Sequence, residues 1–307
     1  MTATSTHTTL LYDGDRHYAT EAGGFLRAGL DQGHRGLVMA PASRVEAIRA
    51  ELGSDADEVT VIDDAVAYGP QWNVYRMLLD FVTAAPGVRS CVIAEQSLAA
   101  RTPVEIVDYR RLESAASLVF AEQPVDLLCP YDARLPGHLV DIALAAHDGV
   151  CEDGSVTPNA RFQDPLAVLA DLAAVSRPPA YAATLDCSQH AGVALIRGLV
   201  RTRGADLGLD RGVLDDLELA VTEVVTNAQL HGSPPVLVHV YDEDETWVWH
   251  VQDRGGMPVH PLAGLLPPDE PAEHGYGLWL ARQLVAAVDV GRDDTGTHVR
   301  LHVRKPA

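Results

Sequence analysis

The first half of the chain alternates short apolar runs with longer stretches that carry apolar residues at helical spacing. The apolar runs predict buried strands at residues 8–12, 36–40, 59–63, 90–94 and 125–132. The stretches between them predict helices at residues 18–32, 44–52, 74–84 and 105–124. Because buried strands that alternate with helices are typical of parallel sheets, we predict an α/β fold with helices on both faces of a mostly parallel sheet.

The second half has a different order of patterns. Strand-like runs occur at residues 181–185, 234–240, 248–252 and 298–303, and helical patterns at residues 188–202, 216–232 and 278–288. This order predicts a layer of helices on one face of a mixed, mainly antiparallel sheet, an α/β sandwich. An Ala/Leu-rich helical piece and then Arg177, Pro178 and Pro179 separate the halves, so we predict domains at residues 1–165 and 180–307 with a linker at 166–179.

Composition narrows the class of protein. Of the 307 residues, 47% are hydrophobic and 21% are charged, which is enough apolar material for proper cores. The net charge is −20 and both halves are acidic, so no general electrostatic surface for nucleic acid is expected. The cysteines are scattered without paired ligand spacing, and no run has the length of a membrane helix. We therefore expect reduced thiols, no membrane contact and a cytoplasmic protein.

Residues 216–232 carry the strongest sign of chemistry. Glu223 and Asn227 lie four residues apart, so both side chains project from one stripe of the predicted helix. An amide oxygen such as that of Asn227 is a neutral ligand that Mg²⁺ accepts, and the Glu223 carboxylate can take a proton. The pair predicts a site for a metal ion and a nucleotide.

Three further motifs follow in order along the chain. Asp253 ends a strand-like run and is followed by Gly255. A His-Gly-Tyr-Gly-Leu sequence at 274–278 then opens a helical run, and Thr297 follows a turn before the last strand. Glycines let a backbone approach phosphates closely, and a helix that begins near Leu278 points its positive end toward them.

Together these motifs resemble the GHKL, or Bergerat-fold, ATP-binding domain over about residues 180–305, and most of all the anti-sigma-factor serine/threonine kinases of bacteria. The resemblance implies ATP and Mg²⁺ as cofactors, Glu223 as the general base and Asn227 as the Mg²⁺ ligand. It implies that Asp253 accepts a hydrogen bond from the adenine amino group. The implied ATP-binding residues are Asn227, Asp253, Gly255, Gly275, Gly277, Leu278 and Thr297.

Two departures from that family's pattern keep a second interpretation open. Residues 253–257 read DRGGM and lack the second spaced glycine of the usual DxGxG box. The following loop, residues 258–274, is acidic and has no Lys or Arg for a γ-phosphate, which leaves Arg254 and Arg282 as candidates. ATP binding without phosphoryl transfer, in a regulatory module that acts by binding a partner, is therefore the alternative to a kinase.

The N-terminal half resembles the MEDS sensory domain, a RecA-like α/β domain, over about residues 5–165. The resemblance rests on residues 7–12, Tyr109, Glu113, residues 128–132 and His147 with Val150, and it implies sensing of a small carbon compound. No phosphate-binding loop of the GxxxxGK type is present, so we predict no second ATP site. At the predicted strand ends, Glu95, Tyr131 and Asp132 are the candidates for a sensing pocket. We interpret Cys129 as a buried strand residue and His147 as a structural hydrogen-bonding group.

The two resemblances together imply a cytoplasmic signalling regulator in which a sensory domain controls an ATP-binding kinase domain. The implied partner is an anti-sigma-factor antagonist or a sigma factor, and kinases of this type are commonly homodimers. A histidine kinase is a weaker interpretation, because no separate helical hairpin carries a phosphoacceptor and His231 lies inside the nucleotide domain. A metabolic enzyme built on the N-terminal fold is a further alternative, since fold does not determine function.

Overall fold

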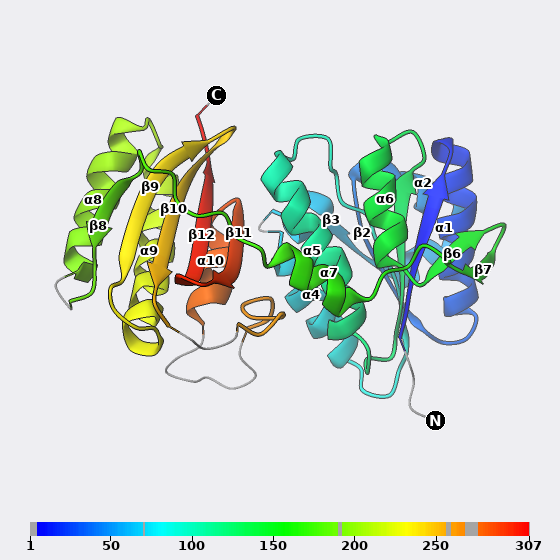
Figure 1. The fold of residues 1–307 in the computed structure, drawn as a ribbon. Coiled ribbons are helices and arrows are strands. Elements are labelled where there is room, and N and C mark those ends of the chain that lie inside the picture. The colour runs from blue at the N-terminus through cyan, green and yellow to red at the C-terminus, as the bar shows by residue number, and fades with distance from the viewer. Residues whose placement is uncertain (1–4, 70, 190–191, 256–258, 268–275, 307) are drawn as a thin grey trace. The chain divides into compact units, whose positions relative to one another are not determined.

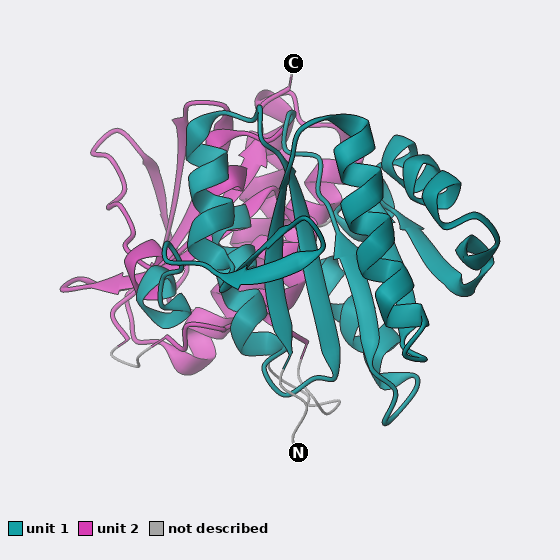
Figure 2. Cartoon of the chain, turned by 90° about the vertical axis from the view of Figure 1, so that its right-hand side faces the viewer, with its two compact units in different colours: residues 1–100, 109–169 teal, residues 101–108, 170–307 magenta. Residues whose placement is uncertain are grey.

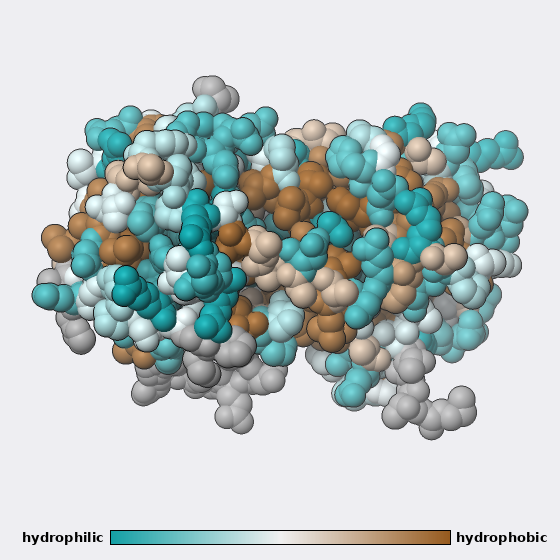
Figure 3. Space-filling model, in the orientation of Figure 1, coloured by the Kyte–Doolittle hydropathy of each residue, from teal (hydrophilic) through white to brown (hydrophobic). Residues whose placement is uncertain are grey.

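The computed structural model describes residues 5–69, 71–189, 192–255, 259–267 and 276–306. The chain divides into two compact units, one of residues 1–100 and 109–169 and the other of residues 101–108 and 170–307 (Figure 2). On the visible face, sizeable groups of hydrophobic residues lie between hydrophilic ones (Figure 3). Within the described ranges, no helix is long and apolar enough to cross a membrane.

The elements of residues 5–172 alternate between strands and helices along most of this length, as the apolar pattern predicts. They are β1 (Thr6–Tyr12), α1 (Gly14–Leu30), β2 (Arg35–Ala40), α2 (Ala42–Leu52), the 3-10 helix η1 (Gly53–Glu58), β3 (Val59–Asp63), α3 (Asp64–Ala67), α4 (Asn73–Thr83), β4 (Ser90–Ala94), α5 (Pro103–Val119), β5 (Val125–Asp132), α6 (Gly137–Ala146), β6 (Gly149–Glu152), β7 (Ser155–Pro158) and α7 (Pro165–Leu172).

The sheet of the first unit has the strand order β3-β2-β4-β5-β1-β6-β7 (Figure 1). Its pairings are parallel except for the β6–β7 hairpin. Leu10 and Leu128 face a core formed with α1 and α2. His7 lies on the opposite side of β1 and contacts Ser117 of α5. The predicted mostly parallel sheet with helices on both faces is confirmed. The β6–β7 hairpin was not predicted, because each strand has only four residues and β7 is exposed throughout.

The second unit contains β8 (Ala183–Asp186), α8 (Gly192–Asp206), α9 (Arg211–His231), β9 (Leu237–Glu243), β10 (Thr246–Asp253), α10 (Gly277–Leu284), β11 (Ala287–Asp293) and β12 (Gly296–Arg304). Its sheet has the order β11-β12-β10-β9-β8, and each pairing is antiparallel. Helices α8, α9 and α10 form a layer on one face (Figure 1). Val221 and Val225 of α9 pack with Trp249 of β10 and Leu301 of β12 in a fully buried core. The predicted α/β sandwich is confirmed, with a more uniformly antiparallel sheet than expected.

One predicted helix is too long. Residues 278–288 were expected to be helical throughout, but α10 ends at Leu284 and residues from Ala287 form the edge strand β11. The backbone N–H of Ala286 already donates to the carbonyl of His302 at 2.9 Å. A short run of Ala and Val fits either period, so pairing with β12 decides that it is a strand.

A chain of hydrogen bonds crosses the face of the sheet opposite to the one on which Trp249 lies. His250 Nδ1 lies 3.1 Å from the Tyr241 hydroxyl. The other ring nitrogen, His250 Nε2, lies 2.8 Å from Nδ1 of His298. His298 Nε2 in turn lies 2.9 Å from an oxygen of Asp293. Two neutral histidines satisfy this chain, because Tyr241 can donate to His250, His250 to His298, and His298 to the carboxylate. Burial lowers the pKa of His250 to about 3.

Candidate functional site

Helix α9 presents Glu223 and Asn227 to the first residue of α10. The helix begins at the cap Asp210, whose side chain accepts a hydrogen bond from the Val213 N–H at 3.0 Å. Three turns later Glu223 and Asn227 are both half-buried. A Cβ atom added to Gly277 would lie 2.6 Å from Asn227 Nδ2 and 3.0 Å from Glu223 Oε2. The structure therefore brings Glu223, Asn227 and Gly277 together, and a side chain at position 277 would displace the Asn227 amide from its present position.

The N-terminal end of α10 offers backbone N–H groups. Tyr276 stands at the N-cap position, and among the described residues no side chain caps the helix there. The first N–H groups of a helix lack intrahelical acceptors and carry the positive end of the helix dipole. An anionic group next to Gly277 would satisfy them.

Asp253 ends β10 with its carboxylate held in one orientation. It is 6% exposed, and its Oδ1 accepts hydrogen bonds from the N–H groups of Ser233 at 3.2 Å and Gly255 at 2.5 Å. A Cβ atom on Gly232 would lie 2.5 Å from Asp253 Cγ, and one on Gly296 would lie 1.8 Å from its carbonyl oxygen. Glycines therefore surround this aspartate because side chains at those positions would occupy the same space.

Thr297 lies directly across from Asp253 in the β10–β12 pairing. Its hydroxyl is 3.4 Å from the carbonyl oxygen of Gly255, at the long end of the hydrogen-bond range. The threonine and the aspartate thus occupy the same end of two neighbouring strands.

A cavity of about 200 Å³ lies between α9 and the sheet. The predicted site residues that line it are Asn227, Asp253, Gly255, Leu278 and Thr297. Much of the remaining wall is formed by Val224, Val251, Val290 and Val299. An apolar cavity with a fixed carboxylate and few other polar groups suits a flat ligand with apolar faces and a polar edge, such as a nucleobase.

Not every predicted residue joins this cavity. Glu223 and Gly277 do not line it but adjoin Asn227. Gly275 lies outside the described residues. Gly232, which ends α9, was not predicted for the site, although a glycine after a helical run is a signal that sequence analysis can use.

Arg282, one candidate for a phosphate contact, is engaged by protein groups in the interior. Its side chain is 4% exposed, and its guanidinium donates to the Val288 carbonyl at 2.9 Å and forms an ion pair with Asp108 at 3.3 Å. Helical periodicity placed it on α10 but could not show which face of that helix is buried. Arg254, the other candidate, is exposed.

The candidates for a sensing pocket in the first unit divide between two faces of the sheet, because Glu95 and Asp132 both lie near Tyr12 and Arg44 whereas Tyr131 does not. Glu95 accepts a hydrogen bond from the Tyr12 hydroxyl at 2.9 Å, on the side of the sheet that packs against α1. The Tyr131 hydroxyl instead lies 2.5 Å from that of Tyr109 on α5. Asp132 forms an ion pair with Arg134. Successive strand residues point to opposite faces, which separates Tyr131 from its neighbour.

The fold and this cavity define the C-terminal part of the chain as an α/β sandwich with an apolar cavity beside a buried aspartate. Residues 188–303 match the family described as the histidine kinase-like ATPase domain, and residues 6–148 match the family described as MEDS, the methanogen/methylotroph, DcmR sensory domain. The chain therefore carries a histidine kinase-like ATPase domain behind a MEDS sensory domain. The ATPase domain implies nucleotide binding.

Comparisons with whole proteins add little to these family matches. No curated protein matches the chain. A crystal structure of the RsbU and RsbW domains of a Mycobacterium tuberculosis protein is similar at 23% identity and a TM-score of 0.31. That similarity covers 43% of this chain and 35% of the other.

Proposed function

We propose that the protein is a signalling regulator whose ATPase domain binds Mg²⁺-ATP and phosphorylates a serine of an anti-sigma-factor antagonist. In this proposal residues 1–165 sense a small molecule, residues 166–179 link the domains and residues 180–307 bind the nucleotide. The meeting of Glu223 and Asn227 with Gly277 at the start of α10 is the observation that carries the proposal. It gathers a base, a metal ligand and phosphate-binding N–H groups at one point.

The base-binding end of the site depends on Asp253. The hydrogen bonds that its carboxylate accepts from described residues all go to Oδ1, which leaves Oδ2 to accept from the adenine amino group. A hydrogen bond to a buried carboxylate is charge-assisted and therefore stronger than one between neutral groups. The valines around the cavity would contact the two faces of the base.

At the phosphate end, three groups of the chain would act. The N–H groups at the start of α10 would bind phosphate oxygens, and Asn227 would hold Mg²⁺ through its amide oxygen. Bound Mg²⁺ supplies positive charge that offsets the charge of the phosphates. Glu223, one helical turn from Asn227, would orient the serine hydroxyl and take its proton.

A second candidate function is nucleotide-dependent binding of a partner without phosphoryl transfer. The described residues that line the cavity include no Lys or Arg, and Arg282 is occupied by other partners. Kinases usually place a cation on the transferred phosphoryl group. In this alternative ATP acts as a switching ligand, and the partner is the antagonist or a sigma factor held by binding.

Two assays distinguish the kinase from the binding module. Calorimetry measures the binding of Mg²⁺-ATP, and labelled ATP measures phosphoryl transfer to candidate antagonists. For the kinase we expect Glu223→Gln to keep ATP affinity within about twofold and to lower transfer about 100-fold or more, because it removes a base without changing size. Asp216→Asn, an exposed change on the same helix, is the matched control. Transfer that survives Glu223→Gln would exclude Glu223 as the base.

The remaining outcomes separate binding from catalysis. If the wild-type protein binds ATP but phosphorylates none of the antagonists, and Glu223→Gln keeps partner regulation, the binding-module proposal holds. Failure of the wild-type protein to bind ATP would refute both functions.

A further inference from the structure

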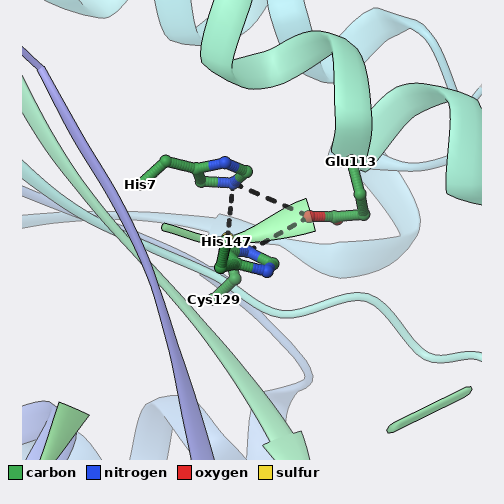
Figure 4. Close-up of side chains that lie close together, drawn as sticks. All are labelled: His7, Glu113, Cys129 and His147. Atoms are coloured by element: carbon green, nitrogen blue, oxygen red, sulfur yellow. Dashed lines mark hydrogen bonds and ion pairs between the residues drawn. The ribbon is translucent and has the colours of Figure 1, made fainter. Parts of the chain in front are cut away.

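Four side chains with metal-binding atoms converge inside the first unit. They come from separate elements: His7 from β1, Glu113 from α5, Cys129 from β5 and His147 from the residue after α6. Figure 4 shows them pointing toward one another between the sheet and α5. Each is at least nine-tenths buried. Such a group of polar atoms in an interior needs a physical explanation.

Three of the six separations among the four atoms match those of a tetrahedral metal site. Glu113 Oε2 lies 3.4 Å from His147 Nε2 and 3.7 Å from His7 Nε2, and Cys129 Sγ lies 3.6 Å from His7 Nε2. The four ligand atoms all lie within 4.8 Å of one another. Zinc bonds of about 2.0–2.3 Å in a tetrahedron place neighbouring ligand atoms about 3.3–3.8 Å apart.

The outer nitrogens of the histidines are already engaged. His147 Nδ1 lies 2.6 Å from the Ala143 carbonyl, and because a carbonyl only accepts, this nitrogen carries the proton. The lone pair of His147 therefore sits on Nε2, which is buried and has no hydrogen-bond partner among the described residues. His7 Nδ1 lies 3.0 Å from Ser117 Oγ. A histidine that ligates a metal usually has such a partner on its other nitrogen.

A hydrogen-bonded network alone does not account for this arrangement. The Nε2 lone pair of His147 faces a carboxylate oxygen of Glu113, and both are acceptors. At 3.4 Å they are farther apart than the donor and acceptor of a normal hydrogen bond to a protonated carboxyl group. A cation between them would satisfy both. The hydrogen-bonded hydroxyls of Tyr109 and Tyr131 lie next to Glu113, and one of them can donate to its carboxylate and hold it in place.

We propose that His7, Glu113, Cys129 and His147 bind one Zn²⁺ ion in the sensory unit. Two imidazoles, a thiolate and a carboxylate form the borderline-soft ligand set that zinc prefers. The carboxylate and the thiolate together balance the charge of a divalent ion, so the loaded site is neutral, as a buried site requires. The ion would join β1, β5, α5 and the end of α6.

Metal content of the purified full-length chain is the first measurement. We expect about one zinc per chain by mass spectrometry of the metal, and a higher Tm when Zn²⁺ is added to chelator-treated protein. Titration of that protein with Co²⁺ should then give tetrahedral visible bands together with a thiolate-to-cobalt charge-transfer band. Absence of stoichiometric zinc or cobalt, or a cobalt spectrum without the thiolate band, would overturn the proposal.

Variants test the ligands individually. Cys129→Ser should abolish the charge-transfer band and weaken Co²⁺ binding about 100-fold or more, whereas Cys91→Ser, at another buried cysteine of the same unit, should not. Ser117→Ala leaves the four ligands in place and should weaken binding about tenfold through the lost contact to His7. Wild-type metal affinity in folded Cys129→Ser would refute the assignment. If that variant does not fold, the Ser117→Ala affinity and the wild-type spectrum decide.

The metal proposal stands apart from the nucleotide proposal. Glu223→Gln and Asp253→Asn change the other unit and should leave zinc content unchanged. Loss of ATP binding with zinc retained would refute only the nucleotide function, and zinc absent with ATP bound would refute only the metal site.

Discussion

Replacement of Asp253 by Asn is the sharpest probe of the proposed adenine contact. The amide oxygen of Asn can still accept the N–H groups of Ser233 and Gly255, which now bond to Oδ1. The atom in the place of Oδ2 becomes an NH₂ group and a donor. The variant therefore keeps the local anchor but turns the acceptor for adenine into a donor.

The expected loss follows from the hydrogen bond that disappears. A hydrogen bond to a charged group contributes about 1.5–3 kcal/mol. Two donors then face each other in a site where Asp253 is only 6% exposed, so water replaces the lost partner poorly. We expect ATP affinity to fall about 10- to 150-fold, since each 1.4 kcal/mol is a factor of ten.

Calorimetry with a pair of nucleotides makes the assay specific. Inosine triphosphate has a carbonyl oxygen where ATP has the amino group. Asp253→Asn should therefore bind ATP more weakly and inosine triphosphate more tightly than the wild-type protein does. A general loss of structure would weaken both nucleotides, and the Tm of the variant provides the check on folding.

Two results would refute this reasoning. Equal ATP affinity in the wild type and in folded Asp253→Asn would show that the carboxylate makes no contact with the base. An equal loss of affinity for ATP and inosine triphosphate in a folded variant would show that Asp253 maintains the shape of the cavity but does not hydrogen-bond to the adenine amino group.

Three further predictions concern packing and pH. Gly277→Ala should weaken ATP binding at least tenfold, because its Cβ would lie 2.6 Å from Asn227 Nδ2; calorimetry that shows unchanged affinity would mean that this contact is not part of the site. Trp249→Ala should lower the free energy of unfolding of the second unit by about 3–5 kcal/mol, because the indole is fully buried; denaturant unfolding that shows less than 1 kcal/mol would contradict the core assignment. The pKa of His250 is lowered to about 3 in the folded protein. Below the usual histidine pKa of about 6.5, the unfolded chain therefore binds a proton at His250 that the folded protein does not bind. His250 alone should then lower stability by up to about 1.4 kcal/mol per pH unit from pH 6 toward pH 4, and His250→Gln should make the fall of Tm across that range less steep. An unchanged slope in the variant would assign the acid sensitivity to other groups.

The sequence determined the parts of this protein that depend on one element at a time. The continuous apolar run of β5 and the period of 3.6 in α9 depend on apolar positions that are close together in the chain. Glu223 and Asn227 share a helix face for the same reason, and Asp253 was correctly expected at a strand end. Local geometry relates residues up to about four positions apart, so such features are readable without a fold.

Only the tertiary structure decided which elements meet. The contact of Gly277 with Asn227, and the glycines around Asp253, depend on how α9, α10 and β10 pack. The pairing of β11 with β12 turned an expected helical run into a strand. The cluster of His7, Glu113, Cys129 and His147 has no ligand spacing in the sequence, because its members come from three elements and the end of a fourth. Strand order and helix packing bring distant residues together, and the hydrophobic period of a single segment predicts neither of them.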